Sequence, residues 1–288
     1  IGEGDSEILR DFLPAEVLDG AFDSIKSEVK WQTMQHRGGE VPRLVAVQGM
    51  VRDDGFVPIY RHPADTQPGL SPFSPTIARI KDEVEGKIGH EVNHVLIQLY
   101  RRGQDNISEH SDKTMDIARE SKIVNVSLGA QRTMVLRTKK GTTDGQFRQT
   151  PPDQNPPSRK IQRVILPHNS MFVLGAMTNM RWLHGIRPDK RETFLKSDAE
   201  KAFGGERISL TFRKISTFTD TNLQVIWGQG ARGKTKEEAE PVSVGGTTEA
   251  EEMIIAFGKE NHQSEFDWDQ NYGKGFNVLD VVDVSSIS

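Results

Sequence analysis

A histidine and an aspartate two residues apart are the first candidates for chemistry in this chain. His110 and Asp112 come after the alternating segment NHVLIQLY and a polar turn. Because strand side chains repeat every two residues, the imidazole and the carboxylate point to the same side. One further imidazole would complete a facial triad of two histidines and a carboxylate, which binds Fe(II) and leaves positions open for a co-substrate and oxygen. An isolated H-x-D pair, however, is more often a solvated turn.

His184 is the candidate for the third ligand. It lies in the short apolar segment MRWLHGIRP, 72 residues after Asp112. A lone histidine there would usually be a buried core residue, but a pattern downstream favours the metal site. Arg207 and Arg213 are six residues apart in the strand-like segment ERISLTFRKI, and an even spacing puts both on one face. Since arginine binds carboxylates in a bidentate manner, the combination predicts a site for iron and a dicarboxylate.

The order of these motifs resembles the AlkB-like family of Fe(II)/2-oxoglutarate-dependent dioxygenases. The resemblance covers about residues 10 to 216, and the segments that carry it are H-S-D, W-L-H-G, R-I-S-L-T-F-R-K-I, V-P-R, V-L-I-Q-L-Y and S-L-G-A-Q-R-T-M-V-L-R. It implies an oxidoreductase that uses Fe(II), 2-oxoglutarate and O2. By the resemblance the metal ligands would be His110, Asp112 and His184.

The resemblance also implies a set of residues around 2-oxoglutarate. Arg207 and Tyr100 would bind its distal carboxylate, and Arg213 would lie near the other end. Thr211 shares the face of the two arginines and could add a hydroxyl donor. Two further positions, where the family often has asparagine, are occupied here by Gln98 and Ser209. Both can still form hydrogen bonds, so we expect an altered affinity for the co-substrate rather than its loss.

The DNA-repair members of the family present a hairpin, an aromatic ring and basic residues to an extruded base and its strand. The residues at or near those places here are Met34, His36, Arg37, Arg43, Tyr60, Thr114, Arg187, Lys190 and Arg191. An ordinary surface hairpin and a solvated basic turn are the competing interpretations. The family often has an acidic residue just after the H-x-D, where this chain has Lys113 and Thr114, so the preferred base is left open.

Many short strand-like segments between turn signals predict a mainly β (α+β) fold, a double-stranded β-helix jelly roll with N-terminal supporting helices and a C-terminal extension. We expect three regions, the helices and hairpin of 1–92, the jelly-roll core of 93–219 and the extension of 220–288. The expected strands are 93–100, 122–128, 132–138, 161–166, 170–174, 182–186 and 206–215. We further expect helices over 14–30 and from Ser74, loops over 52–73 and 139–160, and a helix capped by Thr248 and Glu251.

The composition excludes some kinds of chemistry. None of the 288 residues is cysteine, which excludes disulfides, thiol catalysis and thiolate metal ligands. Residues 220–288 hold 5 Lys and Arg against 13 Asp and Glu, a balance of −8, and the rest of the chain holds 32 against 28, a balance of +4. The acidic extension could pack on the core or bind a protein partner. No apolar run approaches the ~20 residues of a membrane span, and the first residues lack a signal-peptide core, so we expect an intracellular protein of the nucleus or cytoplasm.

The favoured function is oxidative demethylation of N-methylated bases, such as 1-methyladenine and 3-methylcytosine, in DNA more than in RNA, by a monomer. It would release succinate, CO2 and formaldehyde. One alternative keeps the iron site but hydroxylates a small molecule or a protein, and another is a non-catalytic binding module. A third is nucleotide binding, because Gly228 to Thr235 match G-x-x-x-x-G-K-[ST]. That loop works only when it opens a βαβ unit, and the 53 residues that follow show no second buried strand pattern.

Overall fold

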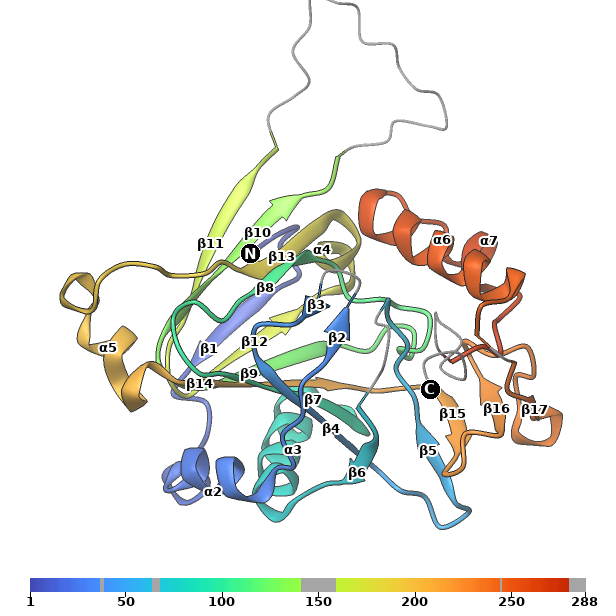
Figure 1. The fold of residues 1–288 in the computed structure, drawn as a ribbon, viewed down its shortest axis with the longest axis horizontal. Helices are drawn as coiled ribbons and strands as arrows, with labels where there is room; N and C mark the ends of the chain where they lie inside the picture. Colours follow the sequence, from blue (N-terminus) through green and yellow to red (C-terminus); the bar gives the residue numbers. More distant parts are fainter. Residues whose placement is uncertain (37–38, 64–67, 141–158, 244, 280–288) are drawn as a thin grey trace, which may run out of the picture.

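The computed structural model describes residues 1–36, 39–63, 68–140, 159–243 and 245–279 (Figure 1). Its centre is two sheets of mostly antiparallel strands. In sheet order the larger one contains β1 (Glu7–Arg10), β12 (Ser170–Leu174), β9 (Ile123–Gly129), β14 (Arg207–Arg213), β7 (His94–Tyr100), β4 (Leu44–Gly49) and β6 (Leu70–Pro72). The smaller one contains β11 (Ile161–Leu166), β10 (Arg132–Thr138), β13 (Trp182–Ile186) and β8 (Ile107–His110).

Side chains of the two sheets share one apolar cluster, which shows that the sheets face each other. Tyr100 and Phe172 come from the larger sheet, and Leu136, Leu166 and Trp182 come from the smaller one. This arrangement confirms the jelly roll expected from the strand pattern. The seven strands predicted for residues 93–215 are all present, with ends that differ by at most two residues.

The other face of the larger sheet is covered by three helices, α1 (Ala15–Leu18), α2 (Ala21–Glu28) and α3 (Pro75–Ile88). Along β14, Ile208, Leu210 and Phe212 point to these helices and are fully buried. The residues between them therefore point into the space between the sheets, because side chains alternate along a strand. The polar residues of β14 therefore face the space between the sheets, and its apolar residues pack against the helices.

Two predictions about the N-terminal region were wrong in detail. The helix expected over 14–30 is broken, because Gly20 has a left-handed backbone (φ 67°) that ends α1 and begins α2. The expected loop over 52–73 contains β5 (Phe56–Pro58) and β6. Both strands are three residues long and exist through pairing with β15 (Thr217–Asp220) and β4, which local sequence does not reveal. The hairpin is present as β2 (Gln35–His36) and β3 (Gly39–Glu40), whereas residues 141–158 of the expected second loop lie outside the described part.

The C-terminal residues form a small sheet and two helices, at one end of the molecule in Figure 1. The sheet contains β17 (Glu240–Pro241), β16 (Val225–Gly228), β15 (Thr217–Asp220) and β5. The helices are α6 (Thr248–His262) and α7 (Trp268–Tyr272), and α6 is capped by Thr247 rather than by Thr248. The remaining short helices are α4 (Ala176–Arg181), α5 (Asp198–Lys201), η1 (Thr193–Leu195), η2 (Ala202–Gly205) and η3 (Lys236–Glu238).

The nucleotide-binding alternative is not supported by this part of the fold. The strand before the G-x-x-x-x-G-K-T segment is β16, which pairs antiparallel with both neighbours. The segment leads into the three-residue turn η3 and not into a helix of a βαβ unit. Lys234 Nζ donates to the backbone carbonyls of Gln229 and Ala231. Among the described helices, none is long and apolar enough to cross a membrane.

Candidate metal centre

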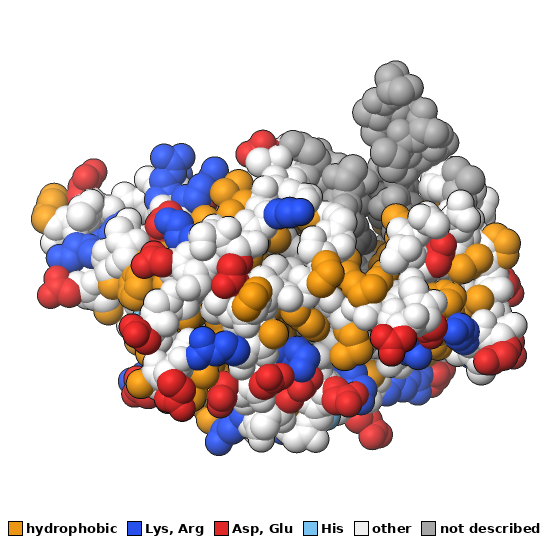
Figure 2. Space-filling model, turned by 90° about the horizontal axis from the view of Figure 1, so that it is seen from below, with side chains coloured by type: hydrophobic (Ala, Val, Ile, Leu, Met, Phe, Trp, Pro, Cys, Tyr) orange, Lys and Arg blue, Asp and Glu red, His pale blue; other side chains and the backbone are white. Residues whose placement is uncertain are grey.

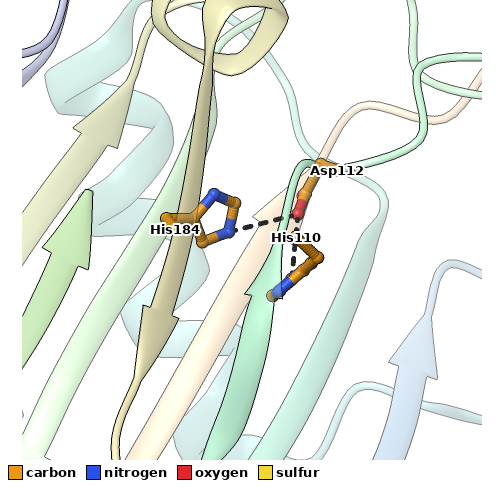
Figure 3. A group of neighbouring side chains, drawn as sticks. All are labelled: His110, Asp112 and His184. Atoms are coloured by element: carbon orange, nitrogen blue, oxygen red, sulfur yellow. Dashed lines mark ion pairs between the residues drawn. The ribbon is translucent and has the colours of Figure 1, made fainter. Parts of the chain in front are cut away.

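The strand pairing of the smaller sheet brings the three predicted metal ligands together. His184 on β13 lies directly opposite His110, the last residue of β8, and Asp112 follows two residues later. Asp112 Oδ1 lies 3.8 Å from His110 Nε2 and 3.6 Å from His184 Nε2, and one ligand atom from each residue lies within 4.8 Å of the others. Figure 3 shows the three side chains pointing at one another. These separations are too long for hydrogen bonds but suit three ligands of one ion.

The histidines are in the form that binds a metal. His110 Nδ1 lies 2.8 Å from the carbonyl oxygen of Ser108, so a proton on Nδ1 leaves the Nε2 lone pair facing Asp112. Burial lowers the pKa of His110 to about 3, and the nearby His184 adds to the effect. Burial also lowers the pKa of His184. Both imidazoles are therefore neutral near pH 7, and two nitrogens with one carboxylate match the ligand set for Fe(II).

Asp112 is held as a carboxylate by Arg213. Burial alone would raise the pKa of Asp112, but Arg213 and the two imidazoles hold it below its usual range. Arg213 donates from Nε and Nη2 to Oδ2, at 2.9 and 2.7 Å. The other oxygen, Oδ1, is thereby left facing the histidines. The structure thus pairs Arg213 with Asp112, a predicted metal ligand, and the predicted contact of Arg213 with the co-substrate stays a prediction.

A cavity of about 70 Å³ between the sheets joins the metal ligands to Arg207. The predicted co-substrate residues all line it, namely Gln98, Tyr100, Arg207, Ser209, Thr211 and Arg213. Apolar residues complete the wall, among them Leu96, Ile123 and Phe172. The cavity thus has ligands for a metal at one end and a buried cation at the other.

Arg207 lacks an anionic partner within the described part of the chain. Its side chain is 1% exposed, and Nη2 donates to Ser127 Oγ and Asn125 Oδ1 at 2.8 and 3.2 Å. Its Nε and Nη1 are buried there without an acceptor. Burial lowers the pKa of Arg207 to about 10, so the guanidinium stays charged near pH 7. A buried cation with two free donors fits a ligand carboxylate.

Asn125 and Ser127 were missed by the sequence reasoning. They lie on β9 opposite Thr211 and Ser209 of β14, and Asn125 Nδ2 donates to both of those hydroxyls. Two polar residues at alternate positions of the otherwise apolar segment IVNVSLG are the signal that could have found them. His62 was also missed, and its ring lies 5.6 Å from that of Tyr60.

Two of the predicted substrate residues lie beside the loop that carries Asp112. The ring of Tyr60 lies 4.1 Å from the Arg213 guanidinium, and its hydroxyl accepts a hydrogen bond from Lys113 N at 3.0 Å. Thr114 donates to the carboxylate of Glu260. Both tyrosine and threonine are therefore already engaged by protein groups.

The other predicted substrate residues are spread more widely. Met34 is buried against Val45, and Arg43 is buried with Nη1 donating to the carbonyl of Asn106. Arg187, Lys190 and Arg191 are exposed after β13, and Arg191 forms ion pairs with Asp189 and Glu200. The side chain of His36, and Arg37 as a whole, lie outside the described residues.

Comparison with known proteins agrees with this geometry. The family described as the 2OG-Fe(II) oxygenase superfamily matches residues 5–213, which include the three predicted metal ligands and Arg207. The chain belongs to the 2OG-Fe(II) oxygenase superfamily. Membership confirms the expected enzyme class, a dioxygenase that is an oxidoreductase, and the expected Fe(II), 2-oxoglutarate and O2.

The related proteins of this superfamily are AlkB-like, which confirms the resemblance. "DNA oxidative demethylase ALKBH2" of Homo sapiens is 35% identical over 206 residues, which cover 69% of this chain and 64% of that protein. "Alpha-ketoglutarate-dependent dioxygenase alkB homolog 3" of Bos taurus is 25% identical over 212 residues, covering 71% and 64%. The chain thus spans just under two-thirds of the length of these relatives. A solved structure titled "The structure of OsALKBH1" matches 73% of this chain and 98% of its own, with 18% identity and a TM-score of 0.44.

Proposed function

We propose that this protein is an AlkB-type oxidative demethylase that removes methyl groups from N-methylated bases in nucleic acid. The observation that carries the proposal is the cavity between the predicted metal triad and Arg207, whose guanidinium has no anionic partner among the described residues. It is supported by the similarity to a protein named as a DNA oxidative demethylase. We propose 1-methyladenine and 3-methylcytosine as the bases, DNA in preference to RNA as the polymer, and a monomer in the nucleus or cytoplasm as the acting species.

In this proposal His110, Asp112 and His184 would hold Fe(II), which with O2 and 2-oxoglutarate would supply the oxidising chemistry. One oxygen atom of O2 enters succinate and the other enters the methyl group, and CO2 leaves. The hydroxymethyl group on nitrogen then breaks down to formaldehyde and the repaired base. Each residue around the site has a part that follows from its contacts.

Arg207 would bind the distal carboxylate of 2-oxoglutarate, because it lines the cavity and its buried Nε and Nη1 have no acceptor among the described residues. Arg213 would keep Asp112 ionised and correctly rotated by holding Oδ2. The apolar wall of Leu96, Ile123 and Phe172 would exclude water from the reacting groups.

The nucleic acid would approach from the side of Tyr60, where the partly exposed ring of His62 lies beside the tyrosine.

Figure 2 shows a different face, that of α2 and α3, where acidic and basic side chains are interspersed. Charge therefore does not mark that face as a phosphate-binding surface. We propose Arg43, Thr114, Arg187, Lys190 and Arg191, together with the hairpin residues Met34, His36 and Arg37, as the remaining substrate contacts.

The test is formaldehyde release from methylated oligonucleotides with Fe(II), 2-oxoglutarate and ascorbate. Single- and double-stranded DNA and RNA carrying 1-methyladenine or 3-methylcytosine would be compared, with His110→Ala as the inactive control. We expect release that the control variant lacks. Turnover of 2-oxoglutarate to succinate without formaldehyde from any oligonucleotide would reject nucleic acid and favour the hydroxylation of a small molecule or a protein.

A further inference from the structure

The loop that carries Asp112 is held in place by side chains from other parts of the chain. Residues 111–114 follow β8 and belong to no strand or helix. Each of their four backbone N–H groups donates to a side-chain oxygen: Ser111 to Asn261 at 3.0 Å, Asp112 to Asn179 at 2.9 Å, Lys113 to Tyr60 at 3.0 Å and Thr114 to Glu260 at 3.0 Å. Two of the four acceptors lie in the last turn of α6, beyond the residues that the family matches.

Glu260 is held by hydrogen bonds to both its side chain and its backbone. It is 3% exposed, and its carboxylate accepts hydrogen bonds from the Thr114 hydroxyl at 2.5 Å and the Tyr272 hydroxyl at 2.6 Å. Its backbone carbonyl accepts a hydrogen bond from the buried Lys139 Nζ. The adjoining face of α6 packs Phe257 against Tyr272 in a cluster that also includes Met115. The helix therefore cannot shift relative to the loop without breaking several contacts.

Asn261 binds the beginning of the same loop. Its Oδ1 accepts from Ser111 N and also from Lys113 Nζ, at 3.1 Å. Lys113 Nζ in turn donates to the carbonyl of Ser111 at 2.8 Å. On the far side, Trp268 Nε1 of α7 donates to the carbonyl of Thr114 at 3.2 Å. Ser111, Lys113 and Thr114 are thus all hydrogen-bonded to α6 or α7.

These contacts matter because residues 111–114 belong to no strand, so no neighbouring strand accepts hydrogen bonds from their backbone N–H groups. A backbone N–H that is withdrawn from water needs an acceptor, and losing the acceptor destabilises the arrangement of the loop. The direction of the Asp112 carboxylate depends on the backbone to which it is attached, so a loop that moves takes Oδ1 away from the two imidazoles. Groups that orient a metal ligand from outside change metal affinity by about 10–100-fold when they are removed.

We infer that Glu260 and Asn261 are positioning residues for the metal ligand Asp112, so that the C-terminal extension is a working part of the metal centre. The inference rests on the proposed function for the identity of the centre, and it adds a role for a segment outside the family match. Neither residue touches the ligand atoms, and both act through the backbone of residues 111–114. One acidic residue of the extension, Glu260, has this role, because its buried carboxylate is the acceptor.

The experiment is a titration with Mn(II) alone, followed by electron paramagnetic resonance of the free ion. Asn261→Ala is the first variant, because Asn261 is only partly buried and its removal should leave the fold intact. Asn261→Asp keeps the oxygen acceptor and serves as the conservative rescue. Glu252→Ala is the matched control, since Glu252 lies on the same helix in an exposed ion pair with Lys274. Circular dichroism and thermal unfolding of each variant monitor the fold.

We expect Asn261→Ala to weaken Mn(II) binding by about 10–100-fold, with Asn261→Asp and Glu252→Ala close to the unchanged protein. Glu260→Gln, which keeps one oxygen acceptor, should bind Mn(II) more tightly than Glu260→Ala. If folded Asn261→Ala binds Mn(II) within twofold of the unchanged protein, the positioning role is wrong although the metal centre stands. If the unchanged protein does not bind Mn(II), the metal centre and this inference both fail. Inactivity on oligonucleotides with normal Mn(II) binding would reject the substrate alone.

Discussion

Arg207→Met tests whether the buried guanidinium of Arg207 binds the co-substrate. The arginine has two buried N–H groups, on Nε and Nη1, without an acceptor in the described residues. The Nε and Nη1 hydrogens point to different sides of the guanidinium, so one carboxylate accepts from one of these two groups, in a charge-assisted hydrogen bond worth about 1.5–3 kcal/mol. Losing this bond raises the Kd for 2-oxoglutarate by about 10- to 10²-fold.

The same substitution should leave the protein without 2-oxoglutarate at least as stable as before. Methionine fills part of the volume and removes a buried cation with unsatisfied donors, which offsets the lost hydrogen bonds to Ser127 and Asn125. A loss of affinity with no loss of stability therefore separates ligand binding from folding. Arg163→Met, at an exposed position of β11, is the matched control.

Isothermal titration calorimetry of 2-oxoglutarate into Mn(II)-loaded protein gives the Kd, and urea unfolding without 2-oxoglutarate gives the free energy of unfolding. The expected pattern is a large rise in Kd for Arg207→Met and little change for Arg163→Met. A Kd within threefold of the unchanged protein would refute the assignment of Arg207, and an equal rise for Arg163→Met would show that the effect is not specific to the cavity.

Two further predictions follow from buried charges. Burial lowers the pKa of His110 to about 3 and lowers the pKa of His184 below its ordinary value, so both imidazoles stay neutral and Mn(II) affinity should stay level as the pH falls through about 6.5, the usual histidine value, and should fall only at lower pH; a midpoint near pH 6.5 in a Mn(II) titration series would contradict it. Asp116→Ala leaves the fully buried Arg61 without the carboxylate that it contacts at 2.6 Å. Urea unfolding should show a loss of about 3–5 kcal/mol, whereas the exposed Glu237→Ala should stay within about 0.5 kcal/mol; equal losses would mean that the ion pair does not stabilise the fold.

Much of the jelly roll could be predicted because its signals are local. Ile208, Leu210 and Phe212 alternate with polar residues on one strand, and this period of two follows from backbone geometry alone. The same alternation correctly placed Arg207, Ser209, Thr211 and Arg213 on the cavity side. The predictions failed where an element depends on a distant partner, as with β5 and β6, or on one residue's backbone, as with Gly20.

The amino-acid sequence by itself determined the ligand types, their order and the side of the strand on which each one lies, because these depend on neighbours only two to six residues apart. Tertiary structure decided that His184 lies opposite His110, that Arg213 pairs with Asp112, and that Asn125 meets Ser209 and Thr211. It also brought Glu260 and Asn261 to a loop that lies 146 to 150 residues earlier in the chain. Such contacts form only where the free energy gained from buried surface and hydrogen bonds exceeds the entropy cost of closing long loops. This balance involves the whole chain, so a local sequence pattern does not reveal it.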